Sequence, residues 1–83
     1  MTEFSEYDKS VIDRAVRSIE EDFRFVSSIP TNQEVYWLRF DSNVGKKREV
    51  RREIQRQMRE DFGVKIMWED SRTVCINIKN KVN

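Results

Sequence analysis

The sequence predicts one small α+β domain over residues 1–83, a two-layer sandwich with two helices on one face of a four-stranded sheet. Three observations lead to this prediction. Apolar residues recur at three- and four-residue spacing in two long segments, and they alternate in several short segments between and after them. The chain also matches itself when it is shifted by 39 positions, which aligns residues 11–40 with residues 50–79.

The first helix is predicted over residues 5–22. Ser5 is a suitable N-cap, and the acidic residues Glu6 and Asp8 interact favourably with the positive end of the helix dipole. The predicted buried stripe consists of the apolar residues at helical spacing, which are Tyr7, Val11, Ile12, Ala15, Val16 and Ile19.

Two strands are predicted after this helix. Residues 23–29 favour a short strand because their apolar residues alternate and two of them are aromatic, although the same residues also fit a continuation of the helix. A turn at residues 30–33 leads into residues 34–40, which have the stronger strand pattern. Both faces of this second strand are apolar, as in a central strand, so the sequence leaves open whether Trp37 and Arg39 face the core or the solvent.

The second helix is predicted from near residue 44 to residue 62. Ser42 or Asn43 can serve as its N-cap, and Gly63 favours the left-handed conformation that commonly ends a helix. Its predicted buried stripe consists of Val50, Ile54, Met58 and Phe62.

The last predicted elements form a hairpin, with strands at residues 64–68 and 73–79 joined by a turn at residues 69–72. With them, a helix-strand-strand unit is used twice, and the 39-position shift gives six identities in thirty aligned residues. This element order resembles a circular permutation of the ferredoxin-like sandwich. The resemblance concerns element order and carries over no functional residue.

An alternative order follows if residues 23–29 stay helical. The chain then reads helix-strand-helix-strand-strand. In that order, the strand, basic helix and hairpin after residue 33 resemble the second half of Alba-type chromatin proteins and the C-terminal domain of bacterial initiation factor three. This second resemblance is also one of topology, without a shared sequence motif.

The composition argues against catalysis. The chain has no histidine and one cysteine, Cys75, so it lacks the commonest general base and cannot form an internal disulfide or a multi-thiolate metal site. We therefore expect no enzymatic activity, no metal and no cofactor. Because the sequence has neither an apolar run of about 18 to 20 residues nor a basic, apolar leader, we expect a cytoplasmic protein without a membrane partner.

Positive charge is concentrated in the second part of the chain. The net charge of +1 combines −3 over residues 1–30 with +4 over residues 31–83. Arginine binds phosphate through paired hydrogen bonds, so the basic face of the second helix predicts nucleic-acid binding. The candidate residues are Lys46, Lys47, Arg48, Arg51, Arg52, Arg56 and Arg59. The alternative is a solvated helix face neutralised by the pairs Glu49–Arg52, Glu53–Arg56 and Arg56–Glu60.

The open face of the sheet is a second candidate surface. If Tyr36, Leu38 and Phe40 are buried, the candidate contacts on this face are Trp37, Arg39, Lys65, Met67 and Lys79. Aromatic and basic groups together can stack on the bases of a single strand and neutralise its phosphates. We predict a small non-enzymatic module that binds DNA or RNA. The alternative is a regulatory or adaptor protein that binds another protein, or a second copy, through this face or an edge strand.

Overall fold

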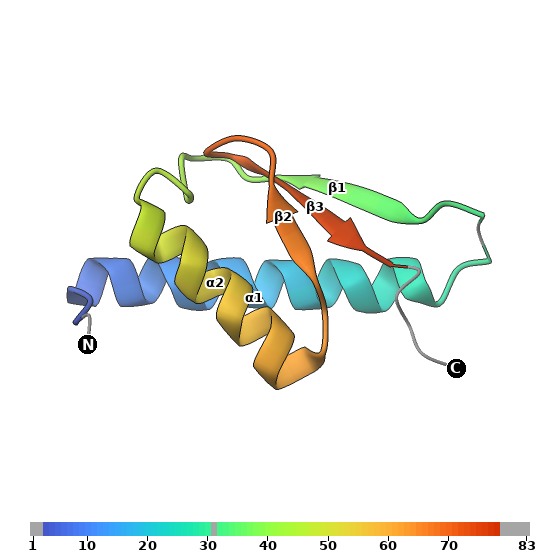
Figure 1. Cartoon of the computed structure of the whole chain (residues 1–83), viewed down its shortest axis with the longest axis horizontal. Coiled ribbons are helices and arrows are strands. Elements are labelled where there is room, and N and C mark those ends of the chain that lie inside the picture. The colour runs from blue at the N-terminus through green and yellow to red at the C-terminus, as the bar shows by residue number, and fades with distance from the viewer. Residues whose placement is uncertain (1–2, 31, 79–83) are drawn as a thin grey trace.

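The computed structural model describes residues 3–30 and 32–78. Within these ranges the elements follow in the order α1 (Glu6–Ser27), β1 (Val35–Arg39), α2 (Arg48–Phe62), β2 (Ile66–Trp68) and β3 (Thr73–Asn77) (Figure 1). The described strands form one antiparallel sheet of three strands in the order β1-β3-β2. The α+β class is confirmed, whereas the predicted four-stranded sheet made from two helix-strand-strand units is wrong.

The error lies in residues 23–27, which continue α1 instead of forming a strand. Phe23 is half-buried and Val26 is only 8% exposed, so both residues extend the helical spacing of the buried stripe. Arg24 pairs with Glu20 one turn earlier, which also requires a helix here. Helical periodicity therefore outweighs the β propensity of the two phenylalanines, and the order is the alternative one, helix-strand-helix-strand-strand.

The start of α1 and the end of α2 match the predictions. The Ser5 hydroxyl accepts a hydrogen bond of 3.0 Å from the backbone N–H of Asp8. Gly63 follows α2 with a φ angle of 68°, and the N–H of Val64 donates to the carbonyl of Met58 over 3.0 Å. These bonds satisfy helix carbonyls that would otherwise lack a partner.

The other end of α2 differs from the prediction. The helix begins after Lys47, which makes no side-chain capping bond, so Ser42 and Asn43 lie in the connection and do not cap the helix. Phe62 also departs from its predicted place. It is 46% exposed, because it lies in the last turn of α2, beyond the part of the helix that packs on the core.

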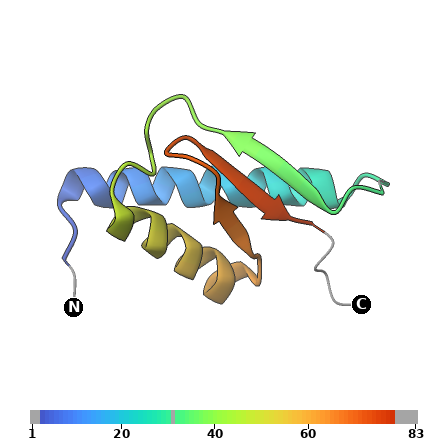
Figure 2. The same ribbon diagram turned by 45° about the horizontal axis from the view of Figure 1, so that its top comes forward.

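The helices and the sheet form two layers, as Figures 1 and 2 show. β1 and β2 each pair with β3 in the antiparallel direction, so they run parallel to one another with β3 between them. α2 connects β1 to β2, and a connection between parallel strands of one sheet places its helix on a face of that sheet.

A single core lies between the helices and one face of the sheet. Ile19 of α1, Ile54 of α2 and Ile76 of β3 are fully buried in it. In the hairpin, alternate residues point inward, with Trp68 half-buried and the others buried: Val64, Ile66, Val74, Ile76 and Ile78.

The structure also decides the orientation of β1. Tyr36 and Leu38 are half-buried against the core, whereas Trp37 is 54% exposed and Arg39 is exposed on the open face. In this orientation, the predicted sheet-face contacts Trp37, Arg39, Lys65 and Met67 share one surface.

Candidate functional site

The seven predicted basic residues at α2 fall into two groups. In the first group the side chain bonds to another residue of the protein, and Lys47 belongs to this group. Its Nζ lies 3.0 Å from Oδ2 of Asp8, which is only 9% exposed on α1. The ion pair joins the N-terminal ends of the two helices across 39 positions of sequence. Lys47 is therefore committed to holding α1 and α2 together.

Arg51 also has a structural role. Its Nη1 donates to the carbonyl of Gly45 over 2.6 Å, and its own carbonyl accepts a bond of 3.2 Å from the indole Nε1 of Trp68. Trp68 packs directly on Gly45, where a Cβ atom would lie 2.6 Å from the indole ring. Sequence reasoning did not find this contact, which joins residues far apart in the chain.

Arg56 is neutralised by two carboxylates. Its Nε and Nη2 donate to Glu53 over 3.0 and 2.6 Å, and its Nη1 donates to Glu60 over 2.7 Å. The hydrogen bond with Glu53 is the main cause that raises the pKa of Arg56, and the same bond lowers the pKa of Glu53. The predicted pairs Glu53–Arg56 and Arg56–Glu60 therefore exist, but the predicted pair Glu49–Arg52 does not.

The side chains of the other four cations form no hydrogen bond or ion pair with any residue that the structure describes, and all four residues are exposed. Three of them lie on α2 at spacings of four and seven residues, which places them along one line of the helix surface. We call these four residues the cationic stripe: Lys46, Arg48, Arg52 and Arg59.

The cationic stripe runs alongside β2. Gln55 lies on the same line of α2 as Arg52 and Arg59, and its Nε2 donates to the carbonyl of Ile66 over 3.1 Å. That bond covers the outer edge of β2 with α2. The stripe is therefore placed next to the edge of the sheet.

The strand register arranges the open face in three rows. Trp37 of β1 and Met67 of β2 both lie opposite Cys75 of β3, and we call these three residues the apolar row. The rows on either side are Arg39–Thr73–Glu69 and Val35–Asn77–Lys65. The apolar row is accessible, because Trp37 is 54% and Met67 is 59% exposed.

Two further residues of the predicted site need comment. Lys79, a predicted sheet-face contact, lies outside the described residues. Burial and the charge of Glu69 raise the pKa of the Cys75 thiol. A thiol that stays protonated at neutral pH is a packing group and not a nucleophile, so Cys75 contributes apolar surface to the row.

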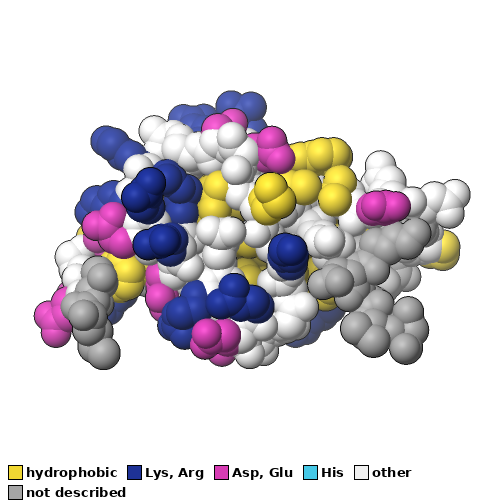
Figure 3. Space-filling view, viewed as in Figure 1, with side chains coloured by type: hydrophobic (Ala, Val, Ile, Leu, Met, Phe, Trp, Pro, Cys, Tyr) yellow, Lys and Arg dark blue, Asp and Glu magenta, His cyan; other side chains and the backbone are white. Residues whose placement is uncertain are grey.

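Hydrophobic and basic side chains lie next to each other on one side of the molecule (Figure 3). In Figure 3, hydrophobic side chains gather over the sheet, and Lys and Arg side chains gather over α2 beside it. The two predicted surfaces, the basic helix face and the open sheet face, are therefore neighbours.

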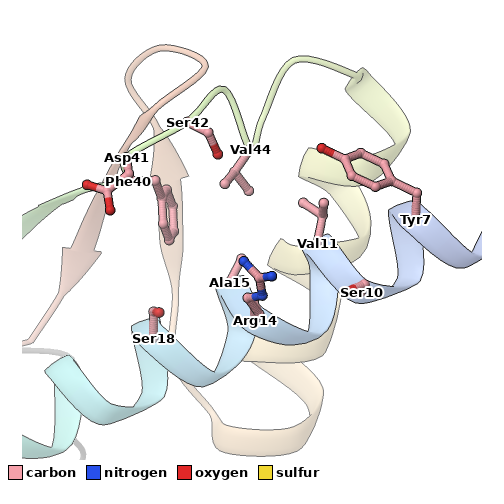
Figure 4. A pocket seen from close by; sticks show the side chains of 10 residues that line it. All are labelled: Tyr7, Ser10, Val11, Arg14, Ala15, Ser18, Phe40, Asp41, Ser42 and Val44. Carbon is pink, nitrogen blue, oxygen red and sulfur yellow. The ribbon is translucent and has the colours of Figure 1, made fainter.

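A hollow of about 320 Å³ lies between α1 and the connection from β1 to α2. Figure 4 shows Val11, Ala15 and Arg14 of α1 on one side of it and Phe40, Ser42 and Val44 on the other. Sequence reasoning missed this groove, although Ser10, Arg14 and Ser18 recur at four-residue spacing on α1. The groove presents both Arg14 and Asp41, so it has no preference for one sign of ligand charge.

Comparisons with protein-family models, with curated proteins and with solved structures find no match to this chain. Within residues 3–30 and 32–78, no group of three or more His, Cys, Asp or Glu side chains could hold a metal ion. Neither described helix is long and apolar enough to cross a membrane. The candidate site consequently rests on its own geometry.

Proposed function

We propose that this protein binds nucleic acid through the cationic stripe. The proposal is supported by one observation: some basic side chains at α2 are paired with other groups of the protein, and others are not. Arg48, Arg52 and Arg59 project from one side of α2 and form no ion pair with a described carboxylate, while Arg56 on the neighbouring side is neutralised by Glu53 and Glu60. A row of unpaired guanidinium groups on a rigid helix matches a chain of phosphates.

Binding of this kind has a characteristic salt dependence. Each phosphate that a cation neutralises releases counterions, so the logarithm of the affinity falls linearly with the logarithm of the salt concentration, with a slope of about −0.9 for each phosphate on duplex DNA and about −0.7 on single strands. Three or four contacts predict a slope of about −2 to −4. A hydrophobic interface would show little such dependence.

The test is a fluorescence-anisotropy titration of labelled DNA and RNA at several salt concentrations. The double variant Arg52→Gln/Arg59→Gln should weaken binding about tenfold or more and make the salt slope smaller by about 1.5 to 2. Arg56→Gln is the matched control, since it removes an arginine from the same helix that is already paired, and it should change affinity less than about twofold. Equal effects of both variants, or no binding by the wild type, would contradict the proposal.

A second candidate function is supported by the edge of β1. The carbonyl of Glu34 and the N–H of Phe40 bond to the β3 side, and bonding direction alternates along an antiparallel strand. The N–H and C=O groups of Val35, Trp37 and Arg39 therefore point to the edge that no described strand covers. Such an edge can pair with a strand from a second copy of the chain.

Sedimentation at increasing protein concentration tests this second candidate. Because the N–H of Val35 points outward, Val35→Pro should prevent edge pairing while leaving the bonds to β3 intact. Val35→Thr is the control and should associate as the wild type does. A wild-type chain that stays monomeric at every concentration would exclude pairing between copies.

A further inference from the structure

We propose that the nucleic acid is single-stranded, with a base stacked on Trp37 and with the backbone crossing the sheet past Lys65 to follow the cationic stripe. This inference rests on the proposed function and extends it to the type of ligand and its path.

The apolar row suits unpaired bases. Trp37 presents an indole that is 54% exposed at one end of the row, and the Met67 side chain is 59% exposed at the other. The two residues are separated by two strand spacings, about 10 Å across the sheet. Bases inside a duplex have both faces covered by their neighbours, so a flat aromatic platform of this kind can stack only on an unpaired base.

The charges beside the row favour one path for the backbone. At the two ends of β2, the row on one side of Met67 ends in Glu69 and the row on the other side ends in Lys65. A phosphate is repelled by the first and attracted by the second. The Lys65 side chain forms no hydrogen bond or ion pair with the described residues, so its charge is available.

The cationic stripe continues from Lys65. Gln55 bonds to Ile66 and the carbonyl of Arg51 bonds to Trp68, so α2 and β2 run in opposite directions. The C-terminal part of α2, with Arg59, therefore lies at the Lys65 end of β2. A backbone that leaves the sheet over Lys65 meets Arg59 first, then Arg52 and Arg48. The sheet contributes base contacts and the helix contributes phosphate contacts.

The experiment compares short homopyrimidine DNA and RNA strands with a duplex of the same length by anisotropy at one salt concentration. Single strands should bind more tightly than the duplex, and Trp37→Ala should weaken single-strand binding by about five- to a hundredfold. Trp37→Phe keeps an aromatic face and should lose much less. Phe25→Ala is the matched control, because Phe25 is a 67% exposed aromatic residue on α1, away from the site. The DNA and RNA arms identify which single strand is preferred.

A second pair of variants tests the path. Lys65→Gln should weaken binding about threefold or more, whereas Glu69→Gln should leave it unchanged or strengthen it. The proposal is overturned if the duplex binds as tightly as the single strands, or if Trp37→Ala and Trp37→Phe bind like the wild type. If Arg52→Gln/Arg59→Gln still weakens binding in that case, nucleic-acid binding itself stands. Absence of salt-dependent binding to any of these ligands overturns both proposals.

Discussion

In α1, three of the four basic residues pair with an acid of the same helix, as Lys9 with Glu6, Arg17 with Asp13 and Arg24 with Glu20. In α2, only one of the five arginines does so, Arg56. Spacing is one cause. An acid lies three or four residues before each of those bases in α1, whereas Gln55 and Arg56 occupy the same positions before Arg59. Arg52 has Glu49 three residues before it, but the two side chains do not form an ion pair.

The number of charges on a helix therefore does not distinguish a neutralised face from a binding surface. The two helices have similar buried stripes, and both carry many charged residues. What differs is how many of the bases form an ion pair with an acid one turn away. Only α2 therefore presents a line of unpaired cations.

The largest expected effect is the loss of stability when a buried residue of α1 or α2 is truncated, which tests whether the two helices contribute equally to the core. Ile19 of α1 and Ile54 of α2 are both fully buried, so replacing either by alanine should reduce the free energy of unfolding by about 2–5 kcal/mol. Urea unfolding measures the loss. Ile→Val at the same positions should cost about 0.5–1.5 kcal/mol and remain foldable. If one of the two positions tolerates alanine without loss, the helices do not contribute equally to the core.

The next effect concerns how α2 begins. α1 begins with a Ser5 cap, whereas the connection into α2 is held by the packing of Trp68 on Gly45. In Gly45→Ala, the new Cβ would lie 2.6 Å from the indole ring, so the ring must shift and stability should fall by about 1–3 kcal/mol. Thermal or urea unfolding measures this change. Unchanged stability in this variant would show that the ring moves freely.

A third variant makes α2 resemble α1. Gln55→Glu places an acid three residues after Arg52 and four residues before Arg59, so it should pair with these arginines without removing either. Affinity for nucleic acid should fall about fivefold, and the salt slope should become smaller by about one. Gln55→Ala is the control, because it loses the same bond to Ile66 and leaves both arginines unpaired. Equal affinities of the two variants would mean that the unpaired arginines do not bind phosphate.

The smallest expected effect is the pH dependence of the stability that the Glu53–Arg56 pair contributes. The hydrogen bond from Arg56 lowers the pKa of Glu53 in the folded state. Stability from this pair is therefore present above the unfolded pKa of about 4.3 and is lost as the pH falls through the lower folded value. An NMR titration of the Glu53 carboxyl group should give a lowered pKa that rises toward its ordinary value in Arg56→Gln. An unchanged Glu53 pKa in that variant would show that the hydrogen bond from Arg56 does not lower it.

Much of the fold could be predicted because it depends on local patterns. Ser5 and Gly63 act as caps through bonds within a few residues, and Asp70 lies in the predicted hairpin turn, where its Oδ1 accepts bonds of 2.8 Å from the N–H groups of Arg72 and Thr73. The failure at residues 23–27 arose because alternation and helical spacing coexist there. The helix forms because Phe23 and Val26 then pack against the core, and this packing cannot be seen in the local sequence.

The sequence indicated which kinds of residue form the candidate site, but it did not indicate which individual cations remain unpaired. The sequence indicated a basic helix face and an aromatic, basic sheet face, and it also contained the spacing that pairs Arg56 with its acids. It could not indicate that Lys47 binds Asp8 or that Arg51 binds Gly45, because the first contact joins separate elements and the second depends on how the connection folds. Of the seven predicted cations, the four of the cationic stripe remain available.

Local sequence patterns specify the two amphipathic helices, the strand after residue 33, the hairpin and the inward and outward residues of β2 and β3. These features follow from periodicity, which is a property of neighbouring residues. The tertiary structure alone decided the three-strand order, the exposure of Trp37 and the placement of the cationic stripe beside β2. Those features depend on which distant elements pack together, and packing is settled by the whole core.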